Sequence, residues 1–254
     1  MITKNLILLT ALALAAQFNS LAQNSAPSAA LAVRQNVALI PVSRTGAITN
    51  RQSQVLARAK NAPGVYDIEF IGDSITQGWE SRGSNVWNEF YGSRKVINMG
   101  VSGDRTEHVL WRFEQGQLDG IKAKVAVVMI GTNNSNKNKD GMDMYSDTDI
   151  LEGVTAIVNE IRRRQPDTKI ILLGIFPRAK TFSSQRGRLL EINQALAKLD
   201  DGQHIFYLDF GSQLIEKDGT ISKDIMPDAL HPNDAGYRIW AKAIEPKLKE
   251  LLAQ

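Results

Sequence analysis

The stretch Asp67–Trp79 reads DIEFIGDSITQGW, an apolar run that breaks off at a polar turn. Residues 68–71 predict a buried strand, and Gly72-Asp73-Ser74 follows directly at its carboxyl end. In parallel α/β sheets, ligands bind at this end of the strands. Gly72 allows a tight bend, and Ser74 would then lie near a helix amino terminus, where backbone N–H groups favour negative charge. Taken alone, a segment of this kind is more often a turn with a capping serine than a catalytic site.

Strand-like and helix-like segments alternate along the rest of the chain. Predicted strands cover 65–71, 95–99, 124–130, 169–174 and 204–208. Predicted helices cover 50–60, 85–91, 104–114, 147–165, 184–199 and 234–252. Each crossover is long enough for a βαβ unit. We therefore predict one doubly wound α/β domain, a three-layer α/β/α arrangement around a five-stranded parallel sheet.

The composition narrows the classes of function. Of the 254 residues, 43% are hydrophobic and 22% charged, which is ordinary for a soluble globular protein. The formal net charge of +3 is too small to suggest a nucleic acid partner. The lack of cysteine excludes disulfides, thiol catalysis and thiolate metal sites. The three histidines, at 108, 204 and 231, match no zinc spacing, so neither a metal nor another cofactor is predicted.

The first 22 residues have the pattern of a secretory signal peptide. A short basic end precedes an apolar stretch at 6–16, and Ser20-Leu21-Ala22 places small residues at the cleavage positions. The apolar stretch is shorter than the roughly 20 residues of a membrane span. We predict cleavage after Ala22 and a secreted or periplasmic product without a membrane span. Residues 23–49 are predicted to be an irregular tether or strap, followed by a domain at 50–254.

Four segments place chemically useful residues at strand ends or in late loops. His231 lies three residues after Asp228 in DALHPNDAGY, a spacing that lets a carboxylate orient an imidazole acting as general base. The Asn133 amide and the backbone N–H groups of Gly103 and Ser74 could donate to a developing oxyanion. Each segment also has a structural explanation. The histidine segment would serve as a helix cap, and GTNN as a strand-ending turn.

Other readings of the polar residues are weaker. MGVSGD, at 99–104, lacks the third glycine of a dinucleotide fingerprint and the Lys-Ser/Thr of a phosphate loop. His108 is expected on an exposed helix face and His204 at the start of a strand, and both are expected to be structural.

Together the segments resemble the SGNH (GDSL-type) hydrolases. GDSI at 72–75, the glycine of SGD at 102–104, GTNN at 131–134 and DALH at 228–231 follow the four family blocks in order. NMGVSGDRTEHVLWRF and IRRRQPDTKIILLGIFPR are also similar to catalytic subunits of the brain-type platelet-activating factor acetylhydrolase branch. Ile75 replaces the leucine of the name-giving motif, a volume-conserving change. The chain lacks the G-x-S-x-G elbow of ordinary α/β-hydrolases.

The resemblance implies a flavodoxin-like fold and a metal-independent serine esterase. It implies Ser74 as the nucleophile, His231 as general base and acid, and Asp228 as the residue that orients the histidine. It also implies an oxyanion hole made by the N–H groups of Ser74 and Gly103 and the side chain of Asn133. Asp209, after the fifth predicted strand, is the alternative orienting acid.

The predicted substrate is a short acyl ester, with acetyl on a carbohydrate preferred. Secreted bacterial relatives are often carbohydrate acetylesterases, and this chain has no long hydrophobic lid segment. Candidate substrate contacts are Asp73, Trp79, Arg105 and Arg178, with core packing as the alternative for Trp79 and ion pairing for the arginines. A lysophospholipase or short-chain phospholipid acetylhydrolase is the alternative enzyme. A non-catalytic carbohydrate-binding protein on the same fold is the alternative of another class. The resembled subunits pair, so a homodimer is also considered.

Overall fold

The computed structural model describes residues 34–46 and 49–253. From Asn36 onward these residues form one compact unit. The predicted signal peptide and residues 23–33 lie outside the described residues. No helix in the described ranges is long and apolar enough to cross a bilayer.

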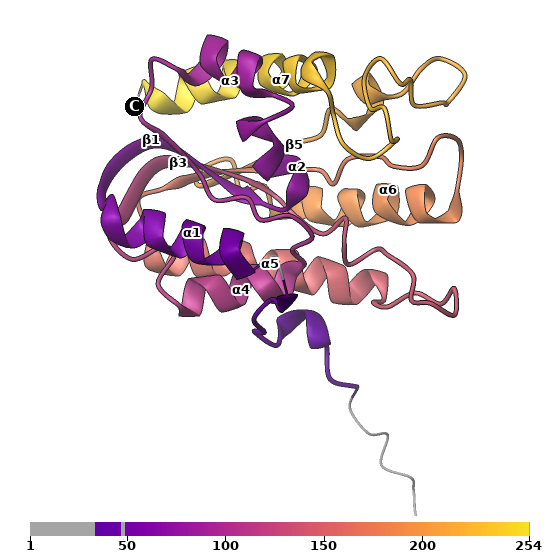
Figure 1. Cartoon of the computed structure of the whole chain (residues 1–254), viewed down its shortest axis with the longest axis horizontal. Helices are drawn as coiled ribbons and strands as arrows, with labels where there is room; N and C mark the ends of the chain where they lie inside the picture. The colour runs from indigo at the N-terminus through magenta and orange to yellow at the C-terminus, as the bar shows by residue number, and fades with distance from the viewer. Residues whose placement is uncertain (1–33, 47–48, 254) are drawn as a thin grey trace, which may run out of the picture. The chain divides into compact units, whose positions relative to one another are not determined.

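The centre of the unit is one parallel sheet with the strand order β2-β1-β3-β4-β5 (Figure 1). The strands are β1 (Gly64–Gly72), β2 (Val96–Asn98), β3 (Ile121–Met129), β4 (Lys169–Leu173) and β5 (Ile205–Leu208). The chain adds β2 on one side of β1 and the remaining strands on the other, so the winding reverses between β1 and β3. Gly72 pairs with Met129 in register, which brings the carboxyl ends of these two strands level. Ligand sites of doubly wound sheets form at this reversal. The predicted fold class is confirmed.

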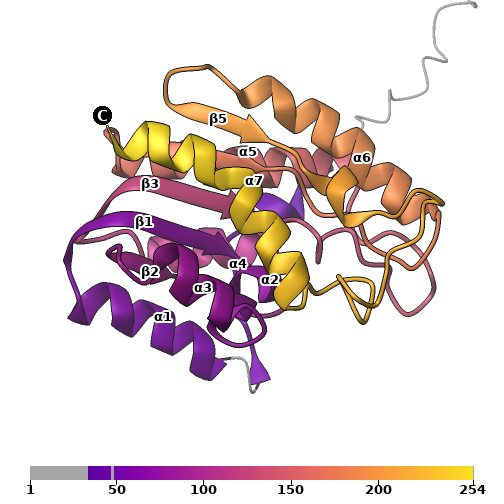
Figure 2. The same ribbon diagram turned by 90° about the horizontal axis from the view of Figure 1, so that it is seen from above.

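Helices cover both faces of the sheet, as two views show (Figures 1 and 2). One face carries α1 (Thr49–Asn61), α4 (Thr106–Glu114), α5 (Asp147–Arg164) and α6 (Ser184–Leu196). The other carries α3 (Ser84–Tyr91) and α7 (Asp234–Leu252), which lie side by side. Short helices complete the unit: η1 (Val37–Leu39), α2 (Ser74–Gln77), η3 (Gly78–Glu80), η4 (Ala197–Leu199) and η5 (Gly211–Leu214).

Strand β1 shows why the sequence reads as a continuous apolar run. Ile68 and Phe70 pack into the cluster under α3 and α7, whereas Ile71 packs into the cluster under the opposite helices. Because both faces are covered, successive residues are apolar rather than alternating. Glu69 is the exception: its carboxyl group is fully buried, and burial raises its pKa to about 8.

The observed elements differ from the sequence prediction mainly in the short helices. The four-residue helix α2 and the single turn η3 contain no full apolar period, so the sequence pattern does not reveal them. Strand β3 starts at Ile121, three residues before the predicted start, because β1 extends its pairing to this end. The expected exposure of His108 was wrong, although its role in the structure is the structural one expected. Its side chain is buried and accepts the Arg105 N–H at 2.9 Å, as part of the cap of α4.

Residues 36–46, which belong to the N-terminal segment, lie along α4 and α5. Ala38 is fully buried, and its carbonyl accepts a hydrogen bond from the Thr106 hydroxyl at 3.1 Å. Asn36 donates to Glu152 on α5 at 2.8 Å. These contacts make the segment part of the compact unit, upstream of the predicted first helix.

Candidate active site

The turn after β1 presents Ser74 at the edge of the sheet. A side chain at Gly72 would collide with Thr76 and with the Met129 carbonyl on the neighbouring strand, so the turn needs glycine. Asp73 then caps α2, because its Oδ1 accepts the N–H of Ile75 at 2.9 Å. Ser74 is the first residue of this helix and is partly exposed.

Ser74, His231 and Asp228 form a continuous hydrogen-bonded line. Ser74 Oγ lies 2.9 Å from His231 Nε2, and His231 Nδ1 lies 2.7 Å from Asp228 Oδ2. With the proton on Nδ1 donated to the carboxylate, Nε2 can accept the serine hydroxyl. Asp228 Oδ1 also accepts the backbone N–H groups of His231, at 2.7 Å, and Leu230, at 3.1 Å. One carboxylate therefore fixes both the turn and the imidazole.

The charge of Asp228 is maintained by this turn. Partial burial opposes ionisation, but the hydrogen bonds from the His231 backbone and ring outweigh it and lower the pKa of Asp228. An ionised carboxylate beside Nδ1 stabilises the imidazolium that forms when Nε2 takes a proton.

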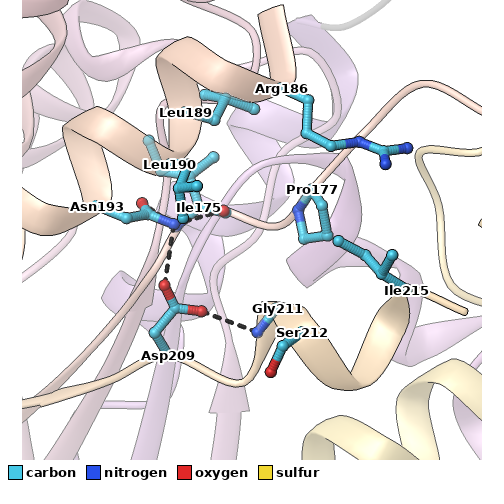
Figure 3. Close-up of a pocket in the computed structure, with 10 residues that line it drawn as sticks. All are labelled: Ile175, Pro177, Arg186, Leu189, Leu190, Asn193, Asp209, Gly211, Ser212 and Ile215. Atoms are coloured by element: carbon cyan, nitrogen blue, oxygen red, sulfur yellow. Dashed lines mark hydrogen bonds between the residues drawn. The ribbon is translucent and has the colours of Figure 1, made fainter. Parts of the chain in front are cut away.

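Asp209, the alternative acid, lies in a different environment (Figure 3). Its carboxylate accepts hydrogen bonds from the Gly211 N–H at 2.8 Å and from Asn193 Nδ2 at 3.2 Å. It lines a mainly apolar pocket of about 360 Å³ between α6 and η5, which neither Ser74 nor His231 lines. The geometry thus pairs Asp228, rather than Asp209, with the imidazole.

The loop after β2, Met99–Arg105, approaches the serine turn; we call it the SGD loop. Gly103 has a φ of +74°, in the left-handed region that favours glycine. Six backbone N–H groups of the loop have acceptors. The pairs, donor first, are Met99 to Phe70 O, Gly100 to Asn98 Oδ1, Val101 to Gly72 O, Ser102 to Gln77 Oε1, Asp104 to Val101 O and Arg105 to His108 Nδ1. Among the described residues, the Gly103 N–H alone in this loop has no acceptor. It is free to bind a ligand oxygen.

Asn133 adds a second donor from the end of β3. Its Nδ2 donates to the Asp104 carbonyl at 2.9 Å, which engages one of its two amide protons. The neighbouring Asn134 is buried and accepts the N–H of Thr106 at 3.1 Å through Oδ1. The GTNN turn is thereby joined to the SGD loop and to α4.

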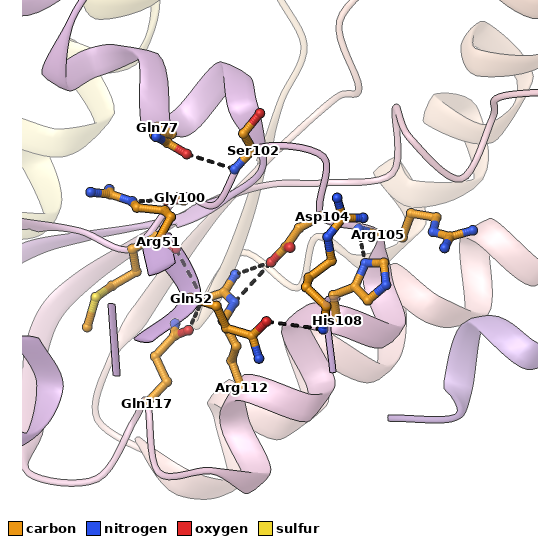
Figure 4. A network of polar contacts seen from close by, with 12 residues as sticks. Arg51, Gln52, Gln77, Gly100, Ser102, Asp104, Arg105, His108, Arg112 and Gln117 are labelled. Atoms are coloured by element: carbon orange, nitrogen blue, oxygen red, sulfur yellow. Dashed lines mark hydrogen bonds and ion pairs between the residues drawn. The ribbon is translucent and has the colours of Figure 1, made fainter. Parts of the chain in front are cut away.

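A buried ion pair supports the SGD loop from below (Figure 4). Asp104 and Arg112 have no exposed side-chain surface, and Asp104 Oδ2 lies 3.0 Å from Arg112 Nε and 2.9 Å from Nη2. Arg112 Nη1 also donates to the Met99 carbonyl at 3.1 Å. Burial raises the pKa of Asp104, while the adjacent guanidinium opposes this shift.

The structure contradicts two of the predicted substrate contacts. Trp79 has no exposed surface and packs among aromatic rings of the core, with the Tyr237 and Trp240 ring centroids 4.5 and 5.0 Å away. It cannot stack on a sugar in this arrangement. Asp73 is also fully buried, because its carboxylate faces inward to cap α2, and burial raises its pKa to about 7.

The two arginines are partly exposed and bound to the protein itself. Arg105 forms an ion pair with Glu107 at 3.0 Å and lies over the ring of Tyr145. Arg178 donates to the Thr132 carbonyl at 2.9 Å and to Asn136 Oδ1 at 2.8 Å, and so supports the GTNN turn. The Arg105 contact is the ion pair considered as the alternative for that residue, whereas the printed contacts of Arg178 are to neutral acceptors.

Sequence reasoning missed a residue that joins the two halves of the site. Tyr237, in the first turns of α7, donates its hydroxyl proton to the Ile75 carbonyl in α2 at 2.7 Å. Helix α7 begins directly after the histidine turn and is capped by Asn233. The available signal was DAGY directly after DALHPN, which places an aromatic residue one helical turn inside the cap.

In the described ranges, no group of three or more His, Asp or Glu side chains is arranged to hold a metal ion. What the site offers is a hydroxyl linked through an imidazole to a carboxylate, with a free N–H group and an amide on adjacent loops. This is the arrangement of serine-dependent acyl hydrolases.

Comparison with known proteins agrees with this class. The GDSL-like lipase/acylhydrolase family matches residues 70–239, and the chain belongs to this family. It is accordingly a carboxylic ester hydrolase.

The similar proteins include relatives in sequence and solved structures of similar fold. Human platelet-activating factor acetylhydrolase IB subunit alpha1 is 33% identical over 189 residues, covering 74% of this chain and 78% of the relative. The rat alpha2 subunit is 34% identical with the same coverage. Among solved structures, a GDSL-like lipase from Bacteroides thetaiotaomicron has a TM-score of 0.64 at 18% identity, covering 80% of this chain and 98% of the other. An acetylxylan esterase from Geobacillus stearothermophilus has a TM-score of 0.55 at 19% identity, covering 72% and 94%.

Proposed function

We propose that this esterase removes short acyl groups, acetyl above all, from carbohydrate esters outside the cytoplasm. The line from Ser74 through His231 to Asp228, at 2.9 and 2.7 Å, is the observation that carries the catalytic part. The acyl group is inferred from the relatives: acetylxylan esterases and platelet-activating factor acetylhydrolases differ in the alcohol they release but share an acetyl ester, as their names state. The carbohydrate and the export are inferred from the acetylxylan esterases and from the leader pattern of residues 1–22.

The proposed reaction passes through an acyl-enzyme. Ser74 Oγ attacks the ester carbonyl while His231 Nε2 takes the hydroxyl proton, and Asp228 stabilises the resulting imidazolium. The oxyanion receives hydrogen bonds from the N–H groups of Ser74 and Gly103 and from the second amide proton of Asn133. His231 then protonates the departing alcohol, leaving Ser74 acylated. Water, deprotonated by His231, attacks this ester and releases the acid, which restores the serine.

Substitution of the serine tests this assignment. We expect Ser74→Ala to lower kcat on p-nitrophenyl acetate by at least about 10⁴-fold, because loss of the nucleophile leaves only the binding contributions. Ser53→Ala, at an exposed position on α1, is the matched control and should retain full activity. A fluorophosphonate should label the wild-type protein at one equivalent and Ser74→Ala not at all. Esterase activity retained by Ser74→Ala would refute the assignment, and sugar binding without labelling of the wild type would favour the non-catalytic alternative.

A substrate series separates the carbohydrate from the lipid proposal. Acetate release should be compared on acetylated xylan, acetylated xylooligosaccharides and a phospholipid with a short acetyl chain, beside p-nitrophenyl esters from acetate to octanoate. We expect kcat/KM to fall at least tenfold between the acetate and octanoate esters, with the acetylated oligosaccharides exceeding the phospholipid. Faster hydrolysis of the phospholipid would favour the lipid alternative instead.

Export is tested separately from catalysis. N-terminal sequencing of the protein from the periplasm or medium should give a chain beginning after Ala22. Cytoplasmic protein that begins at Met1 as the sole form would contradict this part of the proposal while leaving the ester chemistry intact.

A further inference from the structure

Three arginines near the amino terminus of the compact unit donate to backbone carbonyls in and directly before the SGD loop. Arg44, in the segment before α1, donates through Nη1 to Gly103 O at 3.0 Å. From α1, Arg51 Nε donates to Gly100 O at 3.0 Å and Arg58 Nη1 to Asn98 O at 2.9 Å. We call Arg44, Arg51 and Arg58 the arginine clamp. All three precede residue 70, where the family match begins.

The clamp supplies three of the side-chain donors that hold backbone carbonyls in and directly before the SGD loop. Arg112 occupies the carbonyl of Met99 and Asn133 that of Asp104, so charged or amide donors hold five carbonyls between residues 98 and 104. The N–H groups of the loop are held as well: within the described residues, each of them except that of Gly103 has an acceptor. A peptide plane held at both its N–H and its C=O group cannot rotate without losing a hydrogen bond.

The peptide groups directly before and after the one that carries the free Gly103 N–H are both held by hydrogen bonds. Gln77 holds the Ser102 N–H at 2.8 Å, as Figure 4 shows, and Arg44 holds the Gly103 carbonyl. A Cβ atom built on Gly103 would lie 2.8 Å from Arg44 Nη2, so the guanidinium packs directly on the glycine. The free N–H therefore lies between two held peptide groups.

The clamp is anchored to η3, the helical turn that directly follows the serine helix α2. Glu80, in the helical turn after α2, accepts from Arg51 Nη1 at 2.8 Å and from Nη2 at 2.9 Å, and it also pairs with Arg58. Gln52 on α1 accepts the Arg44 N–H at 3.1 Å. The serine turn and the SGD loop are thus fixed to the same set of side chains.

We propose that the arginine clamp positions the Gly103 N–H for the oxyanion, which makes the described residues 36–46 and 49–61 a functional part of the site. This inference rests on the proposed function. The three arginines are positioning residues. They act through the loop backbone and through Glu80, and they hold an N–H donor that must already point at the developing charge.

Arg44→Ala is the most direct test. We expect kcat on p-nitrophenyl acetate to fall 10- to 100-fold while KM changes less than threefold, because a misplaced oxyanion donor weakens transition-state binding more than substrate binding. Inactivation by the fluorophosphonate should slow in parallel, since its phosphoryl oxygen occupies the same position. Arg44→Lys, which keeps a cationic donor, should recover part of kcat. Arg163→Ala is the matched control, because Arg163 is exposed on α5 and pairs with Glu160.

Several outcomes would overturn the proposal. A kcat for Arg44→Ala and for Arg51→Ala within threefold of wild type would show that the loop does not need the clamp. A raised KM at unchanged kcat would show that the arginine binds substrate instead. If Arg44→Ala does not fold, Arg44→Gln keeps the side-chain stem and an N–H donor, and a threefold or greater loss of kcat at constant KM is expected of it. A smaller change would count against the proposal.

Failure of this inference can be told apart from failure of the proposed function. If Ser74→Ala abolishes activity and clamp variants match wild type, only the positioning role is wrong. If Ser74→Ala remains active, the proposed function itself is wrong, and the clamp loses its basis with it.

Discussion

Two loops at the carboxyl edge of the sheet are held in opposite ways. The histidine turn, Asp228–His231, is stabilised mainly from within, by one carboxylate that binds two backbone N–H groups and the ring of its own segment. The side chain of Asp228 is 49% exposed. The SGD loop instead depends on contacts from distant segments, and its Asp104–Arg112 pair is fully buried.

The difference agrees with the roles proposed for the two loops. A general base exchanges a proton with the substrate and with water, so the imidazole needs access to the reaction space. An oxyanion donor helps only if it is already oriented when the charge develops, since reorientation during the reaction would cost part of the stabilisation. The molecule thus combines a turn held mainly by its own carboxylate with a loop held by side chains from distant segments.

Of the two loops, the histidine turn is expected to show the larger effect on activity. Asp228→Asn should lower kcat by about 10³–10⁴-fold, because an amide cannot stabilise the imidazolium and favours the wrong tautomer. Its free energy of unfolding should change by roughly 1 kcal/mol, since the lost interactions are near the surface. Asp209→Asn serves as the matched control and should retain activity within a few fold. The reverse ranking of these two variants in a steady-state assay would show that Asp209 is the orienting acid.

For the SGD loop, by contrast, we expect the main effect on the stability of the protein. Arg112→Met leaves Asp104 buried without its partner and should destabilise the protein by about 3–5 kcal/mol, as measured by urea unfolding. The double variant Asp104→Asn/Arg112→Met should recover part of this loss, because no unpaired charge remains. A stability cost below about 1 kcal/mol for Arg112→Met would remove the contrast between the two loops.

Asn133 is a proposed oxyanion donor and also holds the SGD loop through its hydrogen bond to the Asp104 carbonyl. Asn133→Ala removes an oxyanion donor and one hydrogen bond to the SGD loop, so kcat should fall by about 10²–10³-fold with little change in KM. Asn138→Ala, in the exposed loop that follows, is the control. Equal kcat values for the two variants in the same assay would argue against a donor at position 133.

The pH dependence of stability should distinguish buried from exposed carboxylates. The pKa of Glu69 is raised to about 8 from 4.5, so its contribution is complete below about pH 4.5 and is lost as the pH rises through about 8. The pKa of Asp228 is lowered, so its contribution is present above pH 3.8 and is lost at more acidic pH.

Glu69→Gln should remove the first of these two dependences. As the pH rises from about 4.5 to about 8, the free energy of unfolding of the variant should increase relative to wild type by roughly 1.4 kcal/mol for each pH unit. Urea unfolding at pH 5 and pH 8 measures the gain. An equal difference between variant and wild type at both pH values would show that Glu69 does not titrate as expected.

The sequence predicted the sheet and the reactive residues because both leave local signals. Apolar runs such as residues 124–130 mark strands covered on both faces, and Asp228 and His231 are only three positions apart. The supports of the SGD loop leave no such signal. Arg44 and Gly103 are 59 positions apart, and the pairing of a guanidinium with one backbone carbonyl depends on tertiary packing alone. For Trp79 the sequence left substrate stacking and core packing both open, because a tryptophan after a polar turn has the same local pattern in either place, and the structure gives core packing.

The hydrogen bond from Tyr237 to Ile75 also has a consequence for the order of folding. The serine turn belongs to the first strand of the sheet, but α2 receives this bond from the last helix of the chain, 162 positions later. The histidine precedes that helix directly. The site should therefore be assembled only after the C-terminal helix has docked, late in folding, because contacts between distant positions form slowly. A chain still being synthesised would contain its serine long before it contained a working esterase.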